Sequence, residues 1–131
     1  MLYSESKLEG KVLEIAQRHK LLAKDAVLKV FFASEPNGRL PFWGRCVKMN
    51  CLEKTLTNLD FVILVNQSWW EKATQPQRDA LLLHELLHIT KNAQGGWSLM
   101  KHTIEEFVEV VQHFGAWRTD LEPLFAAVKS S

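Results

Sequence analysis

Two histidines with a glutamate beside the first are the side chains of this sequence best suited to metal chemistry. They are His84, Glu85 and His88, in the order H-E-x-x-H. On a helix, residues four positions apart project from the same face. Two imidazole nitrogens can then reach one zinc ion at about 2.0–2.1 Å, and the glutamate is close enough to contact a water beside that ion. The pattern predicts metal-assisted hydrolysis with Glu85 as the general base.

The remaining positions of the segment 80–89 are apolar on nearly every side of a helix. They are Ala80, Leu81, Leu82, Leu83, Leu86, Leu87 and Ile89. The two histidines and the glutamate fall within one arc of about 100°. Burying an isolated carboxylate and two imidazoles costs on the order of several kcal/mol, which a divalent cation would offset. The alternative is two core histidines that are hydrogen-bonded to the backbone.

A catalytic zinc ion usually has three protein ligands, so a third must come from elsewhere in the chain. We favour His102, because Thr103 begins a capping box and a reversal at Gly95–Gly96 would bring the next helix back beside the first. Glu105 is the rival, either as a ligand or as a group that hydrogen-bonds a ligand imidazole. Glu106 is expected to be engaged in the capping box.

The flanking sequence predicts a helix, then strands, then further helices. The expected helices span 7–19, Thr74 to about Lys91, 103–115 and 121–128, with a short helical turn at 68–71. The expected strands span 27–32, 42–49 and 61–65. This order is typical of an α+β fold with a small three-stranded sheet that is antiparallel or mixed.

Two further expectations concern packing. The strand over 61–65 is apolar at every position, which predicts that other elements cover both of its faces. Three tryptophans flank the histidine helix in the sequence, and we expect them to pack against the core rather than to line a substrate groove. They are Trp69, Trp70 and Trp97.

Composition narrows the class of protein. The 131 residues are 47% hydrophobic and 24% charged, with a net charge of +1, which is typical of one globular domain spanning 1–131. The near-neutral charge does not indicate a nucleic-acid partner. No apolar run is long enough for a membrane span or a secretory signal, so we expect a cytoplasmic protein. Cys46 and Cys51 are then expected to be reduced, partly buried thiols without a role in the mechanism.

The sequence resembles the putative phage metallopeptidase family, a minimal zincin-type domain distantly similar to SprT-like metalloproteases. The resemblance is carried by the segments 84–88, 101–107 and 114–117 together with the order of elements before them. It implies that His84, His88 and His102 are zinc ligands, that Glu85 is the general base, and that the protein acts in the host cytoplasm if a phage encodes it. Thr103 departs from the expected pattern, because an aspartate would be expected after the third histidine.

The function predicted is therefore a zinc metallopeptidase that acts on a protein or peptide. The alternatives are an inactive, zinc-stabilised binding or regulatory module and a metal-free interaction domain. By analogy with zincins, the run 42–49 or the strand 61–65 could offer an edge to an extended peptide. The donor for the oxyanion stays unassigned, since no spacing argument supports Tyr3, Arg45, Lys101 or His113.

Overall fold

The computed structural model describes residues 1–100. The helices predicted over 103–115 and 121–128 lie outside the described residues. The elements in chain order are β1 (Leu2–Glu5), α1 (Glu9–Arg18), the 3₁₀ helix η1 (Leu22–Asp25), β2 (Leu28–Ser34), β3 (Gly44–Lys48), α2 (Cys51–Thr57), β4 (Phe61–Asn66), α3 (Gln67–Lys72), α4 (Gln75–Leu87), β5 (Ile89–Lys91) and β6 (Trp97–Leu99). The expected α+β class is confirmed.

The main sheet has four strands rather than the three predicted, in the order β1-β2-β4-β3. The two central strands, β2 and β4, run parallel, and each outer strand is antiparallel to its neighbour. The additional strand, β1, was not predicted, because its four residues are all exposed and do not alternate between polar and apolar side chains. β5 and β6 form a separate antiparallel hairpin.

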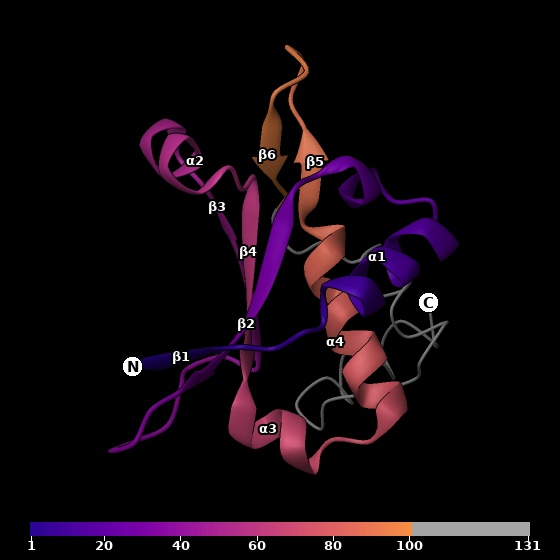
Figure 1. The fold of residues 1–131 in the computed structure, drawn as a ribbon. Coiled ribbons are helices and arrows are strands. Elements are labelled where there is room, and N and C mark those ends of the chain that lie inside the picture. Colours follow the sequence, from indigo (N-terminus) through magenta and orange to yellow (C-terminus); the bar gives the residue numbers. More distant parts are fainter. Residues whose placement is uncertain (101–131) are drawn as a thin grey trace, which may run out of the picture.

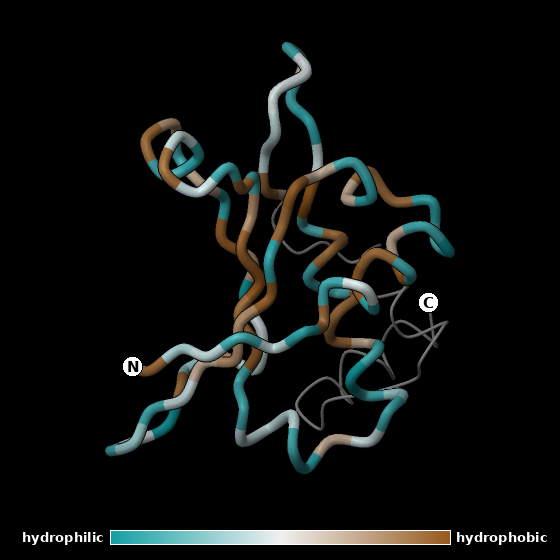
Figure 2. Tube along the Cα trace, in the orientation of Figure 1, coloured by the Kyte–Doolittle hydropathy of each residue, from teal (hydrophilic) through white to brown (hydrophobic). Residues whose placement is uncertain are grey.

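Helices α1 and α4 both lie on one side of the sheet (Figure 1). Figure 2 shows apolar residues concentrated along the strands and the helix segments that face them. The core between these layers includes Ile15 of α1, Val30 of β2, Ile63 of β4 and Leu82 of α4, none more than 1% exposed. Burial of these aliphatic side chains provides the main driving force that fixes α4 against the sheet.

The β4 strand is covered on one face only, among the residues that the structure describes. Phe61, Ile63 and Val65 are fully buried, whereas Val62 and Leu64, which point to the other face, remain partly exposed. The expectation that both faces of this strand are covered is therefore wrong for residues 1–100. Its apolar composition reflects one buried face and one partly exposed apolar face.

The histidine helix ends earlier than predicted, at Leu87 rather than near Lys91. Ile89 and Thr90 are β-branched, which favours the extended backbone, and they pair with β6. Gly95–Gly96 thus belongs to the turn of a β-hairpin and does not reverse the chain between two helices. Gly95 has a φ of 82°, and the Asn92 side chain accepts hydrogen bonds from two backbone N–H groups of this turn.

Two short helices show how local capping defines elements outside the core. α2 was missed, although Asn50 and Glu53 form a full capping box at its start. The predicted turn at 68–71 is confirmed as α3, whose N-cap is Asn66. Trp70 of α3 makes an edge contact with Phe32 of β2, with ring centroids 5.9 Å apart. These contacts attach the start of the α3–α4 segment to the sheet.

The tryptophans pack against the core as expected. Trp69 stacks on Trp43 with ring centroids 5.2 Å apart, and Trp97 makes an edge contact with Phe61 at 5.8 Å. Within residues 1–100, no helix is both long and apolar enough to cross a membrane.

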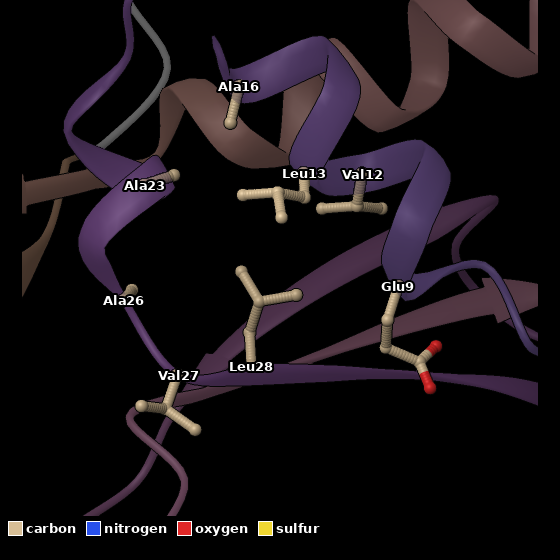
Figure 3. A pocket seen from close by; sticks show the side chains of 8 residues that line it. All are labelled: Glu9, Val12, Leu13, Ala16, Ala23, Ala26, Val27 and Leu28. Carbon is tan, nitrogen blue, oxygen red and sulfur yellow. The ribbon is translucent and has the colours of Figure 1, made fainter.

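An apolar cavity lies between α1, η1 and the start of β2 (Figure 3). Glu9 supplies the one charged side chain of its lining. None of the three residues of the H-E-x-x-H pattern lines this cavity, so it is separate from the candidate site.

Candidate metal centre

Helix α4 carries the candidate centre, and its start is fixed by the sequence-predicted cap. The Thr74 side chain accepts a hydrogen bond from the Gln77 backbone N–H, while the Gln77 side chain accepts one from the Thr74 N–H. Pro76 lies in the first turn, where its missing N–H costs nothing. From residue 80 to residue 86 every side chain of α4 is buried. The prediction of a capped helix buried on nearly all sides is confirmed.

His84, Glu85 and His88 come together at the C-terminal end of this helix, where His88 is the C-cap. His84 is 3% and Glu85 4% exposed, while His88 is half-buried. The His84 Nε2 atom lies 4.0 Å from Glu85 Oε2, and the two imidazole rings are 5.2 Å apart between centroids. One possible ligand atom from each residue lies within 4.8 Å of the other two. The group therefore resembles an H-E-x-x-H metal site and has the donor atoms to hold a divalent cation.

The hairpin determines which nitrogen of His88 can bind a metal. His88 Nδ1 lies 2.6 Å from the carbonyl oxygen of Met100, which can only accept a hydrogen bond. The proton of a neutral imidazole is then on Nδ1, and the lone pair is on Nε2. Metal-bound histidines are commonly oriented by such a bond from their second nitrogen. His88 is thus already oriented as an Nε2 ligand.

The edge strand β3 packs closely over the glutamate. A Cβ atom added to Gly44 would lie 2.8 Å from Leu81 Cδ1 and 3.1 Å from Glu85 Oε2. Any larger residue at this position would displace the buried Leu81 side chain or the carboxylate. Gly44 therefore sets the separation between β3 and the candidate centre.

An open pocket borders the centre between β3 and the end of β6. Its lining residues are Gly44, Arg45, Cys46, Glu85, His88, Leu99 and Met100. Glu85 and His88 can thus be reached from outside the protein along one side of β3. Of the oxyanion candidates weighed from the sequence, Arg45 is the one that lines this pocket within residues 1–100.

Cys46 is a residue of this site that the sequence analysis left out. It faces the same side of β3 as Gly44, since alternate residues of a strand share a face. Burial raises the pKa of the Cys46 thiol well above its ordinary value, and the nearby Glu85 carboxylate raises that pKa further. Both cysteines are free, but Cys51 is exposed rather than partly buried as expected. The adjacency of Cys46 and Glu85 depends on tertiary packing and has no signal in the sequence.

The third ligand is not placed. His102 and its rival Glu105 lie outside the described residues, as do Lys101, Glu106 and His113. Residues 1–100 contribute His84, Glu85 and His88 as a metal-binding group.

A family model described as "Putative phage metallopeptidase" matches residues 2–129, which is nearly the whole chain. No curated protein and no solved structure matches the sequence. The match includes the H-E-x-x-H residues of α4 and the segment that contains His102. The chain therefore belongs to the putative phage metallopeptidase family.

Proposed function

We propose that the protein is a zinc-dependent peptidase whose site is built on His84, Glu85 and His88. The observation that carries this proposal is the group itself: two imidazoles and a carboxylate lie together on a core helix, next to an open pocket. Imidazole nitrogens and carboxylate oxygens held this close together can serve as ligands of one divalent cation. Family membership supports hydrolysis of a peptide bond as the reaction.

The donor set fits zinc, for which imidazole nitrogen is a preferred ligand. His84 and His88 would hold the ion, with His102 as the third ligand and Glu105 as the alternative. His102 follows Met100 by two positions in the sequence, whereas Glu105 follows it by five. Met100 is itself hydrogen-bonded to His88. Proximity in the sequence to Met100 therefore supports His102 more directly than Glu105.

When bound, zinc would polarise the scissile carbonyl and make a water molecule more acidic. Glu85 would accept a proton from the attacking water and pass it to the leaving amine. Its carboxylate is 4% exposed but borders the pocket, so it can reach a water that enters there. Gly44 would position Glu85 by limiting where its Oε2 atom can lie.

The substrate would bind as an extended chain along β3. Of the two strands considered from the sequence, β4 is central and β3 is at the edge of the sheet. An edge strand offers unpaired backbone groups to an added strand. Because β3 also borders the pocket, a peptide paired there would pass close to Glu85 and His88.

A zinc-stabilised binding module is the second candidate. His84 and Glu85 are both nearly fully buried, and structural zinc sites are closed whereas catalytic ones keep an open position. The half-buried His88 and the adjacent pocket favour the peptidase.

Zinc content and turnover of the full chain test both candidates. We expect about one zinc per chain, and loss of zinc in His84→Ala. His102→Ala should weaken zinc binding about tenfold or more, whereas His113→Ala, the matched control, should not. Equal zinc affinity in the His102 variant would shift the assignment to Glu105.

Glu85→Gln separates the two functions. This variant should keep zinc but lose turnover of an unfolded protein substrate, because the amide cannot accept the proton. Full turnover by the variant would contradict the role of Glu85. Zinc binding without turnover in the unmodified chain would favour the binding module, and protein without zinc after growth in zinc-rich medium would contradict both.

A further inference from the structure

The face of the main sheet opposite α1 and α4 carries a partly exposed apolar patch, with the Lys29 Nζ atom 5.8 Å from the centroid of the Phe31 ring. Its side chains form a shallow depression lined by Tyr3, Phe31, Val47, Met49, Val62 and Leu64. Tyr3 is 58% exposed. In Figure 1, α1 and α4 lie on the other side of these strands. Within residues 1–100, no helix covers this depression. Contiguous apolar patches of this kind commonly mark protein contacts.

One row of this face is charged at its two ends. The strand register aligns Glu5 of β1 with Phe31 of β2, Phe31 with Leu64 of β4, and Leu64 with Arg45 of β3. The row therefore runs acid, aromatic, aliphatic, base from one edge of the sheet to the other. An apolar centre lies between opposite charges.

This order is self-complementary under a two-fold rotation. Consider a two-fold axis that lies between the two facing sheets, runs parallel to the strands and passes between Phe31 and Leu64. Rotation about this axis keeps the row at the same position along the strands and exchanges its two ends. Glu5 of each copy would then face Arg45 of the other, and Phe31 would face Leu64. Two-fold dimers are the commonest oligomers, and their contact is reciprocal in this way.

The dimensions of packed sheets allow this contact. Sheets that pack face to face are rotated by about 30° because of their twist. The outer strands lie about 7 Å from the middle of a four-stranded sheet, so the rotation displaces the row ends by about 4 Å. The long side chains of Glu5 and Arg45 can span that displacement.

We propose that this face is the contact between two copies of the chain, packed sheet to sheet about such an axis. In a single chain Glu5 lies 3.5 Å from Lys29, and Arg45 lies over the Phe42 ring at 4.7 Å. Both side chains are at the protein surface, where such contacts contribute little free energy, so they can reorient. Cys46, which lines the pocket beside Glu85, faces the opposite side of β3. Arg45 lines that pocket as well, so the proposed contact meets the pocket at this residue.

Charge reversal tests the axis directly. Sedimentation of the full chain over a wide concentration range should show a monomer–dimer equilibrium. Glu5→Arg and Arg45→Glu should each weaken the dimer about tenfold, because each places like charges together twice. The double variant should restore the dimer to the affinity of the unmodified chain. A monomer at every concentration, or a dimer unaffected by either reversal, would overturn the proposal.

A second variant tests the apolar centre. Leu64→Lys should weaken the dimer more than tenfold, whereas Leu22→Lys, at a 45% exposed leucine of η1, should not. Circular dichroism checks that both variants fold. If Leu64→Lys does not fold, the charge-reversal variants of the exposed Glu5 and Arg45 still test the proposal. In hydroxyl-radical footprinting, Phe31 and Leu64 should become more protected as the protein concentration rises. Protection independent of concentration would overturn the proposal, since another part of the chain would then cover the face.

Discussion

Met100 and His88 are joined by two hydrogen bonds. The Met100 N–H donates to the His88 carbonyl oxygen at 2.6 Å, and His88 Nδ1 donates to the Met100 carbonyl oxygen at 2.6 Å. The end of the β5–β6 hairpin thus fixes the ring of a candidate ligand, although the hairpin itself supplies none of His84, Glu85 and His88. Anything that distorts the hairpin should therefore affect metal binding at α4.

Gly95→Ala tests this link. The φ of 82° at Gly95 is unfavourable for alanine by about 1–2 kcal/mol, so the variant should be less stable and should bind zinc more weakly. Urea unfolding and a zinc titration measure the two effects. Gly10→Ala is the control, because a Cβ there meets nothing within 4 Å and alanine favours the α1 helix. Unchanged zinc affinity in a destabilised Gly95 variant would show that the hairpin does not orient His88.

Gly44→Ala should affect both stability and activity. The added methyl group would contact Leu81 at 2.8 Å and Glu85 Oε2 at 3.1 Å, and such overpacking typically costs about 1–3 kcal/mol. We expect that loss in the free energy of unfolding, together with a lower kcat. Gly38→Ala is the control, since its nearest neighbour would be at 3.7 Å. A fully active Gly44 variant would show that Glu85 is not positioned by β3.

The two cysteines should differ strongly in reactivity. The thiolate is the reactive form, and burial beside the Glu85 carboxylate raises the pKa of Cys46. Cys51 is exposed. A thiol reagent at neutral pH should modify Cys51 about tenfold faster or more, which Cys46→Ser and Cys51→Ser variants can resolve by mass spectrometry. Similar rates at both positions would contradict the burial of Cys46 against Glu85.

Asp60 should stabilise the fold in a pH-dependent way. Burial raises the pKa of this 6% exposed carboxyl, but hydrogen bonds from Lys54 and the Val27 N–H, with the Lys54 charge, outweigh burial and lower the pKa overall. Because the pKa of Asp60 is lower in the folded state, its charge stabilises the fold at every pH above the unfolded-state pKa of about 3.9. This stability is lost as the pH falls through the folded-state pKa.

Asp60→Asn should therefore lower the free energy of unfolding by about 1–3 kcal/mol at neutral pH, with a smaller difference from the unmodified chain in acid. Urea unfolding at several pH values measures both. Asp25→Asn, at a 61% exposed side chain, should have almost no effect. A difference that stays constant with pH would contradict the role assigned to the Asp60 charge.

Local sequence signals predicted α4 well, because the cap at Thr74 and the spacing of His84 and His88 both lie within one short segment of the sequence. The predicted end of that helix lies beyond the observed one, because Ile89 continues the apolar helical pattern. The strand that pairs with Ile89, β6, comes only after the turn that follows, so its effect was not visible locally. β1 was missed because its pairing with β2 joins distant segments. The capping box at Asn50 was a readable signal that was overlooked.

The candidate site also contains residues that local sequence predicts and residues that only tertiary packing brings together. Helical periodicity alone predicted His84, Glu85 and His88, whereas Cys46 and Gly44 reach Glu85 only because β3 packs against α4. That packing depends on the strand register, which single residues of the sequence do not reveal. His102 and Glu105 stay predictions.

The parallel pairing at the middle of the sheet has a consequence for how the chain folds. Residues 28–33 of β2 pair with residues 61–66 of β4, which are synthesised more than thirty residues later. Closing so large a loop costs entropy before any contact is gained, and such pairing is slow. A nascent chain that stops before Asn66 cannot complete the sheet centre, so we expect α1 and β2 to expose apolar surface on the ribosome until β4 emerges.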